Sequence, residues 1–347
     1  MGNIFGNGQQ HEEQDGQQEV RRQQGEQRRQ QEEQRRQQGE QRRQQEEQRR
    51  RQEEQRRQQE EQRRQEEMRR HEEEKVAALK KEVINLFNGQ QLLLLGHYGV
   101  GKSSFINTVN HVLNLVQPNV PYQELAELSA RESDHGTLIY RAYGPRKKMY
   151  MALKESDFSA KQDFGPIFFD VAGVNDKIVN EFDLKQFLIH LVNGQVKEYT
   201  DMVRIYNRED QMEQMRDESK VDNLRAWSII CLVSVADAFP TRLLQHVDQA
   251  LKELKVQPGG GARVFVILTQ SDKINQQERE RTVEDYRKRC SQTLGVVERR
   301  VFQVENYVMR EWRDDVRMEK NLEKENQVLI ALNHILQPAN EPDFLEQ

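Results

Sequence analysis

The sequence is poor in cysteine, and Cys231 and Cys290 are its only thiols in 347 residues. Two isolated cysteines exclude a disulfide framework and a cysteine-based zinc site, and they favour a reducing compartment. Cys231 lies in an apolar run, which predicts a buried, unreactive thiol. Long apolar runs are also missing, since no stretch is long enough to cross a bilayer and the N-terminus lacks the apolar core of a secretion signal. We therefore expect a cytoplasmic protein.

Apolar residues are absent from 21–67, which contains only Arg, Gln, Glu and Gly. Such a segment has no apolar side chains whose burial could offset the entropy cost of folding. It repeats Glu-Gln-Arg-Arg-Gln-Gln with a Gly or Glu spacer every seven residues, but no repeat position is apolar, which excludes a coiled coil with a hydrophobic seam. Glutamates and arginines stand three and four residues apart, a spacing that supports an isolated helix. For 20–74 we expect a solvated single helix or a disordered segment, with a polar, charge-paired self-assembly surface as the alternative.

An excess of positive charge is missing as well. The formal net charge is −5 at pH 7, and the arginines alternate with glutamates, which excludes a general attraction to nucleic acid. Residues 1–19 are expected to form a flexible tip. Removal of Met1 would expose Gly2 for N-myristoylation, although Gly6 stands where the usual pattern has Ser or Thr. The first six residues resemble the myristoylated start of the ADP-ribosylation factors, and a disordered tip is the alternative. One acyl chain binds membranes only marginally, so a peripheral membrane contact would also need oligomerisation or a protein partner.

The rest of the chain, 75–347, is expected to form one α/β domain, and its clearest motif is Gly-x-x-x-x-Gly-Lys-Ser. An apolar run precedes the motif and apolar residues at helical spacing follow it, which predicts a strand, a phosphate-binding loop and a helix whose N-terminus faces the anion. Lys102 is expected to reach the terminal phosphates as a catalytic residue, and Ser103 to ligate magnesium. The alternative is a glycine turn that caps an ordinary helix. The nucleotide-binding residues predicted in this loop are Gly96, His97, Tyr98, Gly99, Val100, Gly101, Lys102, Ser103 and Ser104.

A second nucleotide element has the form Asp-x-x-Gly and follows a short apolar strand. We expect Asp170 to bind magnesium through water, and the N–H of Gly173 to bind the terminal phosphate. Thr137 is the candidate switch residue, with catalytic and magnesium-ligating roles, and an ordinary threonine that opens a strand is the alternative. Val174 stands where many small GTPases have a water-positioning glutamine, so intrinsic hydrolysis should be slow.

Base recognition is predicted at the end of another apolar strand. The carboxylate of Asp272 can accept hydrogen bonds from both N–H groups on the edge of guanine, whereas adenine presents an acceptor there. Thr269 stands where Asn is commonest in such loops, and Gln270 stands where Lys is usual, so we expect micromolar binding. Asn306 follows the last strand, where a further base-contacting loop is expected.

Apolar runs alternate with helical patterns over 75–347, which predicts ligands at the strand ends of a parallel sheet. The expected fold class is α/β, a P-loop NTPase fold of the GTPase type with a mostly parallel sheet flanked by helices, preceded by a long charged helical or disordered extension. The charged residues 193–225 are an insertion of unassigned role. The expected strands are 92–95, a hairpin of 138–140 and 149–151, then 167–169, 227–235, 264–268 and 301–304.

From about 92 to 347 the chain resembles the GTP-binding domain of the interferon-induced protein 44 family. The resemblance is carried by 95–105, by Asp170 with Gly173, by 268–272, and by the ending from Asn306 through 344–346. It implies GTP or GDP with Mg²⁺ as ligands, and an interferon-linked role in innate immunity or antiviral defence. Some members carry a β-rich domain upstream, where this chain has its Arg/Glu/Gln repeat, so functions of that domain are not transferred.

The expected function is that of a slow GTPase or nucleotide switch. The alternative is a scaffold that binds GTP without hydrolysis and acts through its N-terminal helix, and Asp272 disfavours an ATPase. The expected partners are a guanine nucleotide, a second copy bound through the GTP-binding domain, and a membrane if Gly2 is acylated, but no nucleic acid. In such a dimer Arg131 or Arg141 is the candidate catalytic arginine, and a solvated surface charge is the alternative.

Overall fold

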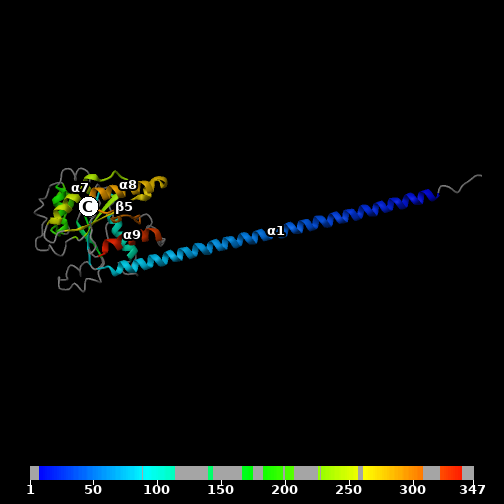
Figure 1. Ribbon diagram of the computed structural model, residues 1–347, viewed down its shortest axis with the longest axis horizontal. Helices are drawn as coiled ribbons and strands as arrows, with labels where there is room; N and C mark the ends of the chain where they lie inside the picture. The colour runs from blue at the N-terminus through cyan, green and yellow to red at the C-terminus, as the bar shows by residue number, and fades with distance from the viewer. Residues whose placement is uncertain are drawn as a thin grey trace, which may run out of the picture. The chain divides into compact units, whose positions relative to one another are not determined.

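The computed structural model divides the chain into two compact units, Met1–His71 and Glu72–Gln347 (Figure 1). Several sequence-based expectations fall outside the described residues, among them those for Gly2, Arg131, Thr137, 149–151 and 344–346. No helix in the described part of the chain is long and apolar enough to cross a membrane. The structure describes residues 8–87, 89–113, 140–143, 166–174, 183–197, 200–206, 226, 228–256, 261–307 and 321–337.

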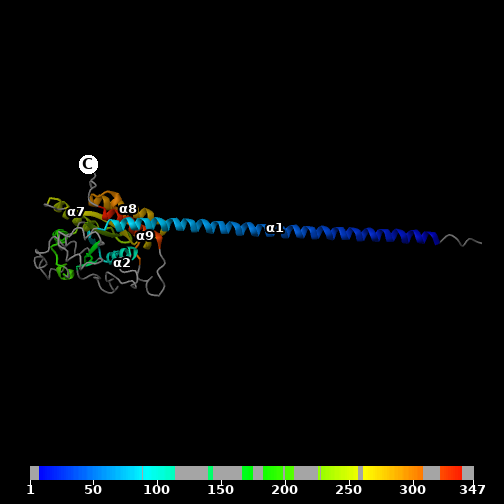
Figure 2. The same cartoon turned by 90° about the horizontal axis from the view of Figure 1, so that it is seen from below.

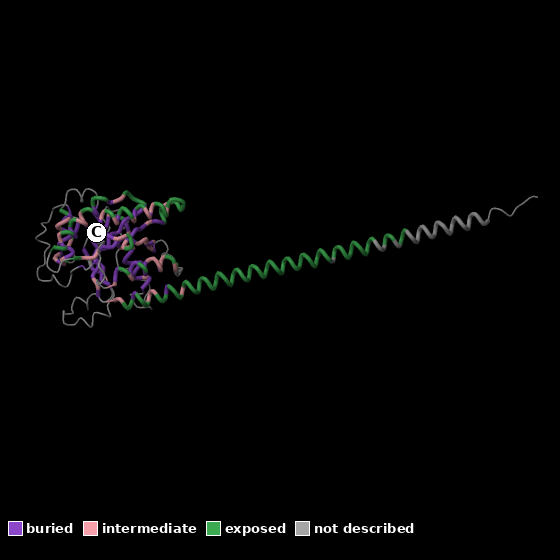
Figure 3. The backbone as a smooth tube through the Cα atoms, viewed as in Figure 1, coloured by how far each residue is buried: buried purple, intermediate pink, exposed green. Residues whose placement is uncertain are grey.

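Helix α1 (Gly8–Asn85) contains the whole repeat, so the helical alternative for 20–74 is the one that the structure adopts. Its described side chains from 25 to 72 are exposed, green in Figure 3. Ion pairs join a glutamate to the arginine four residues later, the favourable order on a helix, worth about 0.3–0.5 kcal/mol each. Their N–O distances run from 2.8 to 3.9 Å, and they are Glu32–Arg36, Glu46–Arg50, Glu47–Arg51, Glu53–Arg57 and Glu60–Arg64.

The second unit is built on a six-stranded sheet in the order β2-β3-β1-β4-β5-β6. All neighbours are parallel except β2 and β3, which are antiparallel. Strand β1 lies between β3 and β4, and the connections that leave β1 and β4 run toward opposite edges of the sheet. Parallel sheets bind ligands beside the carboxyl ends of the strands at such a switch point. The strands are β1 (Gln91–Gly96), β2 (Arg141–Tyr143), β3 (Ile167–Asp170), β4 (Ser228–Ser234), β5 (Arg263–Thr269) and β6 (Val301–Gln303).

Helices cover both faces of this sheet, because successive strand residues point to opposite sides. In β1, Leu93 and Leu95 belong to one apolar core, and Leu92 and Leu94 belong to the other. The first core contains α5 (Leu184–Val192), α6 (Met202–Tyr206), α7 (Thr241–Val256) and α8 (Gln276–Leu294). The second contains α2 (Lys102–Leu113), α9 (Leu322–Leu336) and the last turns of α1. Helix α7 lies beside α8 in both ribbon views (Figures 1 and 2).

The predicted fold class, a mostly parallel α/β sheet flanked by helices and preceded by a long charged helix, is confirmed. Val76 and Val83, in the last turns of α1, are buried in the second core. The buried state of Cys231 is confirmed as well, and Cys290 is buried too.

One expectation about local structure is wrong in its bounds. A strand was predicted at 138–140, but Tyr140 precedes the strand β2, which begins at Arg141 and pairs antiparallel with β3. The predicted hairpin partner 149–151 lies outside the described residues, so the hairpin stays a prediction. The charged, mostly helix-compatible segment 193–225, expected to be an insertion, contains α6 in its described part, and Met202 and Ile205 of this helix are buried in the core.

Candidate functional site

The phosphate-loop motif connects the carboxyl end of β1 to the first turn of α2. Strand β1 ends at Gly96 and helix α2 begins at Lys102. Gly101 has a φ of 94°, a conformation that side chains disfavour, and a Cβ there would lie 2.9 Å from Nδ2 of Asn306. The N–H of Phe105 donates to Gly101 O at 2.8 Å, which closes the first helical turn over the loop. The predicted order of strand, loop and helix is therefore present.

Lys102 lies over the loop with its side chain 7% exposed. Its Nζ donates to the carbonyl oxygens of Gly96 at 3.4 Å and His97 at 3.3 Å. Burial lowers the pKa of Lys102 from its ordinary value of 10.5, and the charge of Asp170 opposes this shift. An anion bound at the loop would stabilise the ammonium group further, because phosphate oxygens are stronger acceptors than backbone carbonyls.

Ser103 and Asp170 form the part of the site that fits a divalent cation. The Oγ of Ser103 donates to Oδ2 of Asp170 at 2.7 Å, and Asp170 is only 1% exposed at the end of β3. Hydroxyl and carboxylate oxygens are suitable ligands for Mg²⁺, which usually keeps several waters and binds substrate phosphates as well. Among the described residues no cluster of three His, Cys, Asp or Glu side chains is placed to hold a metal ion. A cation at Ser103 and Asp170 would therefore depend on a bound nucleotide for its remaining ligands.

The Asp-x-x-Gly segment pairs directly with the phosphate loop. The N–H of Tyr98 donates to Val174 O at 3.2 Å, and the N–H of Val174 donates to Gly96 O at 3.4 Å. A Cβ at Gly173 would lie 2.6 Å from the Cα of Tyr98, so only glycine fits this approach. The side chain of Val174 is 4% exposed and belongs to the apolar core. The residue at this position thus has neither the chemistry nor the direction needed to orient a water molecule at a terminal phosphate.

The two predicted base-contacting loops hold the phosphate loop by its carbonyl oxygens. Thr269 donates through Oγ1 to Val100 O at 2.8 Å, and Gln270 donates through Nε2 to Gly99 O at 2.7 Å. Asn306, from the loop after β6, donates through Nδ2 to Gly101 O at 3.2 Å. Gln270 has a φ of 61°, and its Oε1 accepts from the Oγ of Ser234 at 3.0 Å. These three side chains therefore fix three consecutive peptide groups of the loop.

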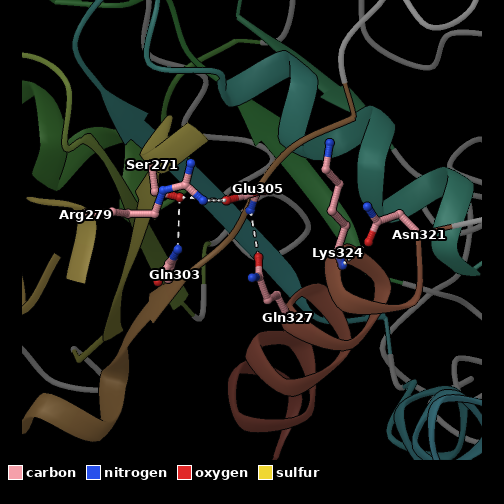
Figure 4. A network of polar contacts seen from close by, with 7 residues as sticks. All are labelled: Ser271, Arg279, Gln303, Glu305, Asn321, Lys324 and Gln327. Carbon is pink, nitrogen blue, oxygen red and sulfur yellow. Dashed lines mark hydrogen bonds and ion pairs between the residues drawn. The ribbon is translucent and has the colours of Figure 1, made fainter. Parts of the chain in front are cut away.

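A polar network behind the predicted base-contacting loops was not expected from the sequence (Figure 4). Ser271 donates to Glu305 Oε1 at 3.1 Å, and Gln303 donates through Nε2 to Ser271 Oγ at 2.9 Å. The guanidinium of Arg279 lies 3.5 Å from Glu305 Oε1, and the backbone N–H of Glu305 donates to Gln327 Oε1 at 3.0 Å. The network joins the 3₁₀ turn Ser271–Lys273, α8, β6 with the loop after it, and α9, which are far apart in sequence, so no local pattern predicts it. It fixes the spacing between the loop at 269–272 and the loop at 304–307.

The same network borders an open depression of about 540 Å³ between α8, β6 and α9. Charged and amide side chains line it, including Arg279, Glu280, Gln303, Glu305 and Gln327. None of the residues predicted to bind nucleotide is among its lining residues, so this depression is separate from the phosphate loop.

The structure thus brings together the loop 96–104, Asp170, Gly173, the loop at 269–270 and Asn306. Asp272 is exposed on the short 3₁₀ turn Ser271–Lys273, and its contact with a base stays a prediction. Tyr98 is 38% exposed within the loop. Thr137 lies outside the described residues, so its switch, catalytic and metal-ligating roles stay predictions.

No protein-family model matches the sequence, and no curated protein matches it. Among solved structures, the chain is similar to translation elongation factor SelB from Methanococcus maripaludis in complex with the GTP analogue GppNHp, with a TM-score of 0.32 and 10% sequence identity. The match covers 63% of this chain and 30% of that chain, so this chain spans less than a third of the factor's length. A similarity of this size carries no functional argument, and the functional assignment depends on the geometry of the site.

Proposed function

We propose that this chain binds GTP with Mg²⁺ through the loop 96–104 and acts as a slow GTPase or nucleotide switch. One observation carries the proposal: Thr269, Gln270 and Asn306, from the two base-contacting loops, bond to three consecutive carbonyls of the phosphate loop. A glycine turn that merely capped α2 would not need this support. The arrangement instead suits a nucleotide that contacts all three loops at once.

Each residue has a chemical role in this proposal. Lys102 and the loop N–H groups hold the phosphates, and Ser103 binds Mg²⁺ directly while Asp170 binds it through water. Bound Mg²⁺ would neutralise charge that develops on the phosphates. Asp272 selects guanine by accepting from its two edge N–H groups, and Asn306 completes the base pocket. Because Val174 offers no polar group, release of phosphate is expected to be slow.

Calorimetric titration of the full chain with GTP, GDP and ATP in magnesium, with phosphate release followed in parallel, tests the proposal. Loss of a charge-assisted hydrogen bond costs about 1.5–3 kcal/mol, so Lys102→Ala should raise the Kd for GTP roughly 10- to 150-fold. The matched control is Lys252→Ala, which removes an exposed lysine that pairs with Asp248 on α7. The proposal fails if neither guanine nucleotide binds, or if the two lysine variants bind GTP equally well.

A second candidate function is a scaffold that binds GTP without hydrolysing it and acts through α1. The burial of Val174 in the core favours it, because no group at that position can position water. Guanine-selective binding without phosphate release, and partner binding that survives Lys102→Ala, would support the scaffold over the GTPase.

The biological setting belongs to the same proposal. The motifs at 95–105 and 268–272 resemble those of the interferon-induced protein 44 family, so we propose an interferon-induced role in the innate immune or antiviral response. The proposed location is the cytoplasm, with peripheral membrane contact if Gly2 is acylated, and a homodimer through the GTP-binding domain is the proposed assembly. Transcript levels that do not rise when cells of the source organism are treated with interferon would argue against this setting.

A further inference from the structure

The glutamines of the repeat occupy only three of its seven positions. They recur at every seventh residue from Gln27 to Gln62, from Gln30 to Gln65 and from Gln31 to Gln59, and Arg51 is the single exception. On a helix, positions separated by three, four and seven residues share one face. We call this stripe the glutamine face of α1. These are the a, d and e positions of a heptad, where a helix that packs against a partner carries its buried residues.

Two heptads beyond the end of the glutamine face, the same helix carries apolar residues. Arg69 and Glu72 stand one heptad after Gln62 and Gln65, and Val76 and Leu79 stand two heptads after them. Val76 is 4% exposed and Leu79 packs against the same core, so these heptad positions are packed where α1 belongs to the second unit. The repeat therefore carries glutamine at the positions that are packed further along the helix.

The charges of the repeat lie at its other four positions. Glu32–Arg36, Glu46–Arg50 and Glu53–Arg57 join position f to position c, on the side opposite the glutamine face. A glutamine amide has both donors and an acceptor, so two such faces can satisfy each other. An apolar partner surface would leave these amides unpaired at a cost in free energy.

The strict period is the feature that a solitary helix does not need. A straight α-helix drifts by about 20° per heptad, so the stripe would turn through roughly 100° between Gln27 and Gln62. It stays directed toward a partner only if two helices wind around each other with a left-handed supercoil. We propose that two copies of this chain associate through the glutamine face of α1, in parallel and in register.

The glutamates beside the stripe decide the orientation. Position g is glutamate at every seventh residue from Glu26 to Glu61. In a parallel pair each g residue faces an e residue of the other helix, here an uncharged glutamine. In an antiparallel pair the g residues would face one another, and the facing glutamates would repel. The parallel pair is the arrangement without this repulsion.

Sedimentation of the full chain over a concentration series, without nucleotide, tests the association. Glutamates introduced by Gln48→Glu, Gln55→Glu and Gln62→Glu place like charges within the glutamine face and should raise the dimer Kd at least tenfold. The matched control, Arg49→Gln, Arg56→Gln and Arg63→Gln, changes the net charge by the same amount at position b and should shift the Kd less than twofold. Circular dichroism should show both variants equally helical, since Glu, Gln and Arg have similar helix propensities.

A disulfide test reports the orientation. Gln55→Cys puts two thiols opposite each other in a parallel, in-register pair and should give a covalent dimer on mild oxidation, whereas Arg56→Cys should not. The native Cys231 and Cys290 are buried, so they should contribute little to the cross-linking. A chain that stays monomeric up to on the order of 0.1 mM overturns the proposal. So does a dimer unaffected by the three glutamates, because its contact would lie elsewhere, and equal cross-linking of both cysteine variants overturns the orientation.

Discussion

Because Gly173 lies close to the phosphate loop, its replacement by alanine should destabilise the second unit, whereas the same replacement of Gly39 should stabilise α1. In Gly173→Ala the new Cβ would lie 2.6 Å from Tyr98 Cα and 2.7 Å from Tyr98 N, both backbone atoms that have no rotamer to change. Real Cβ atoms essentially never come closer than 3.0 Å to another heavy atom, so the loop must move by at least 0.4 Å. This movement stretches the hydrogen bond from Tyr98 N–H to Val174 O. Overpacking of this kind costs about 1–3 kcal/mol.

Thermal unfolding and GTP titration measure the two consequences. For a unit of this size, about 1 kcal/mol lowers the Tm by roughly 2 °C, so we expect a decrease of about 2–6 °C. If GTP binding requires the displaced loop to return to its original position, the same free-energy cost opposes binding, and the Kd for GTP should rise roughly 5- to 150-fold. Gly39→Ala is the control, because a Cβ there meets nothing within 4 Å on α1, and the same change should stabilise the helix by about 0.5–1 kcal/mol. Unchanged Tm and GTP affinity in Gly173→Ala would refute the reasoning.

Four further predictions concern the predicted base-contacting loops and the thiols. Asp272→Asn should weaken GTP binding and favour xanthosine triphosphate, because an amide matches the edge of xanthine, and equal preference for both nucleotides in the variant would place the base elsewhere. Glu305→Ala should raise the Kd for GTP several-fold by releasing Ser271 and Arg279, whereas Glu280→Ala, on the same depression, should leave it unchanged. Burial raises the pKa of Cys290 to about 12 and raises that of Cys231 as well, so a thiol reagent should label neither in the native chain and both in denaturant. Because the unfolded thiols ionise near their ordinary pKa of 9.0 while the folded ones stay neutral, urea unfolding should show stability falling as the pH rises above 9.

The sequence predicts the sheet and the phosphate loop well because their signals are local. Apolar runs mark β1, β4 and β5, and the motif at 96–103 has fixed spacing. Helix α8 has a weak apolar pattern, because only Val283, Tyr286, Cys290 and Leu294 are buried along its 19 residues. Its ends did carry signals, since Asn275 caps the first turn and Gly295 ends the helix with a φ of 62°.

The support of the candidate site could not be predicted from the sequence, because it depends on contacts between distant residues. The bond from Thr269 to Val100 spans 169 residues, and the bond from Ser271 to Glu305 spans 34. Thr269 and Gln270 depart from the usual pattern for such loops, and from sequence alone they read as weaker base ligands. In the structure both residues hold the phosphate loop, a role that only the packed sheet makes possible.

The hydrogen bonds from Thr269, Gln270 and Asn306 to the phosphate-loop carbonyls have a consequence for exchange of the proposed nucleotide. A protein that pulled Asn306 away would release Gly101 O and relax the loop from the side of the base, without competing for the phosphates. Departure of the base and loosening of the grip on the phosphates would then be one event. An exchange factor for this chain would need access only to the loop at 304–307, which leaves the phosphate side free for other partners.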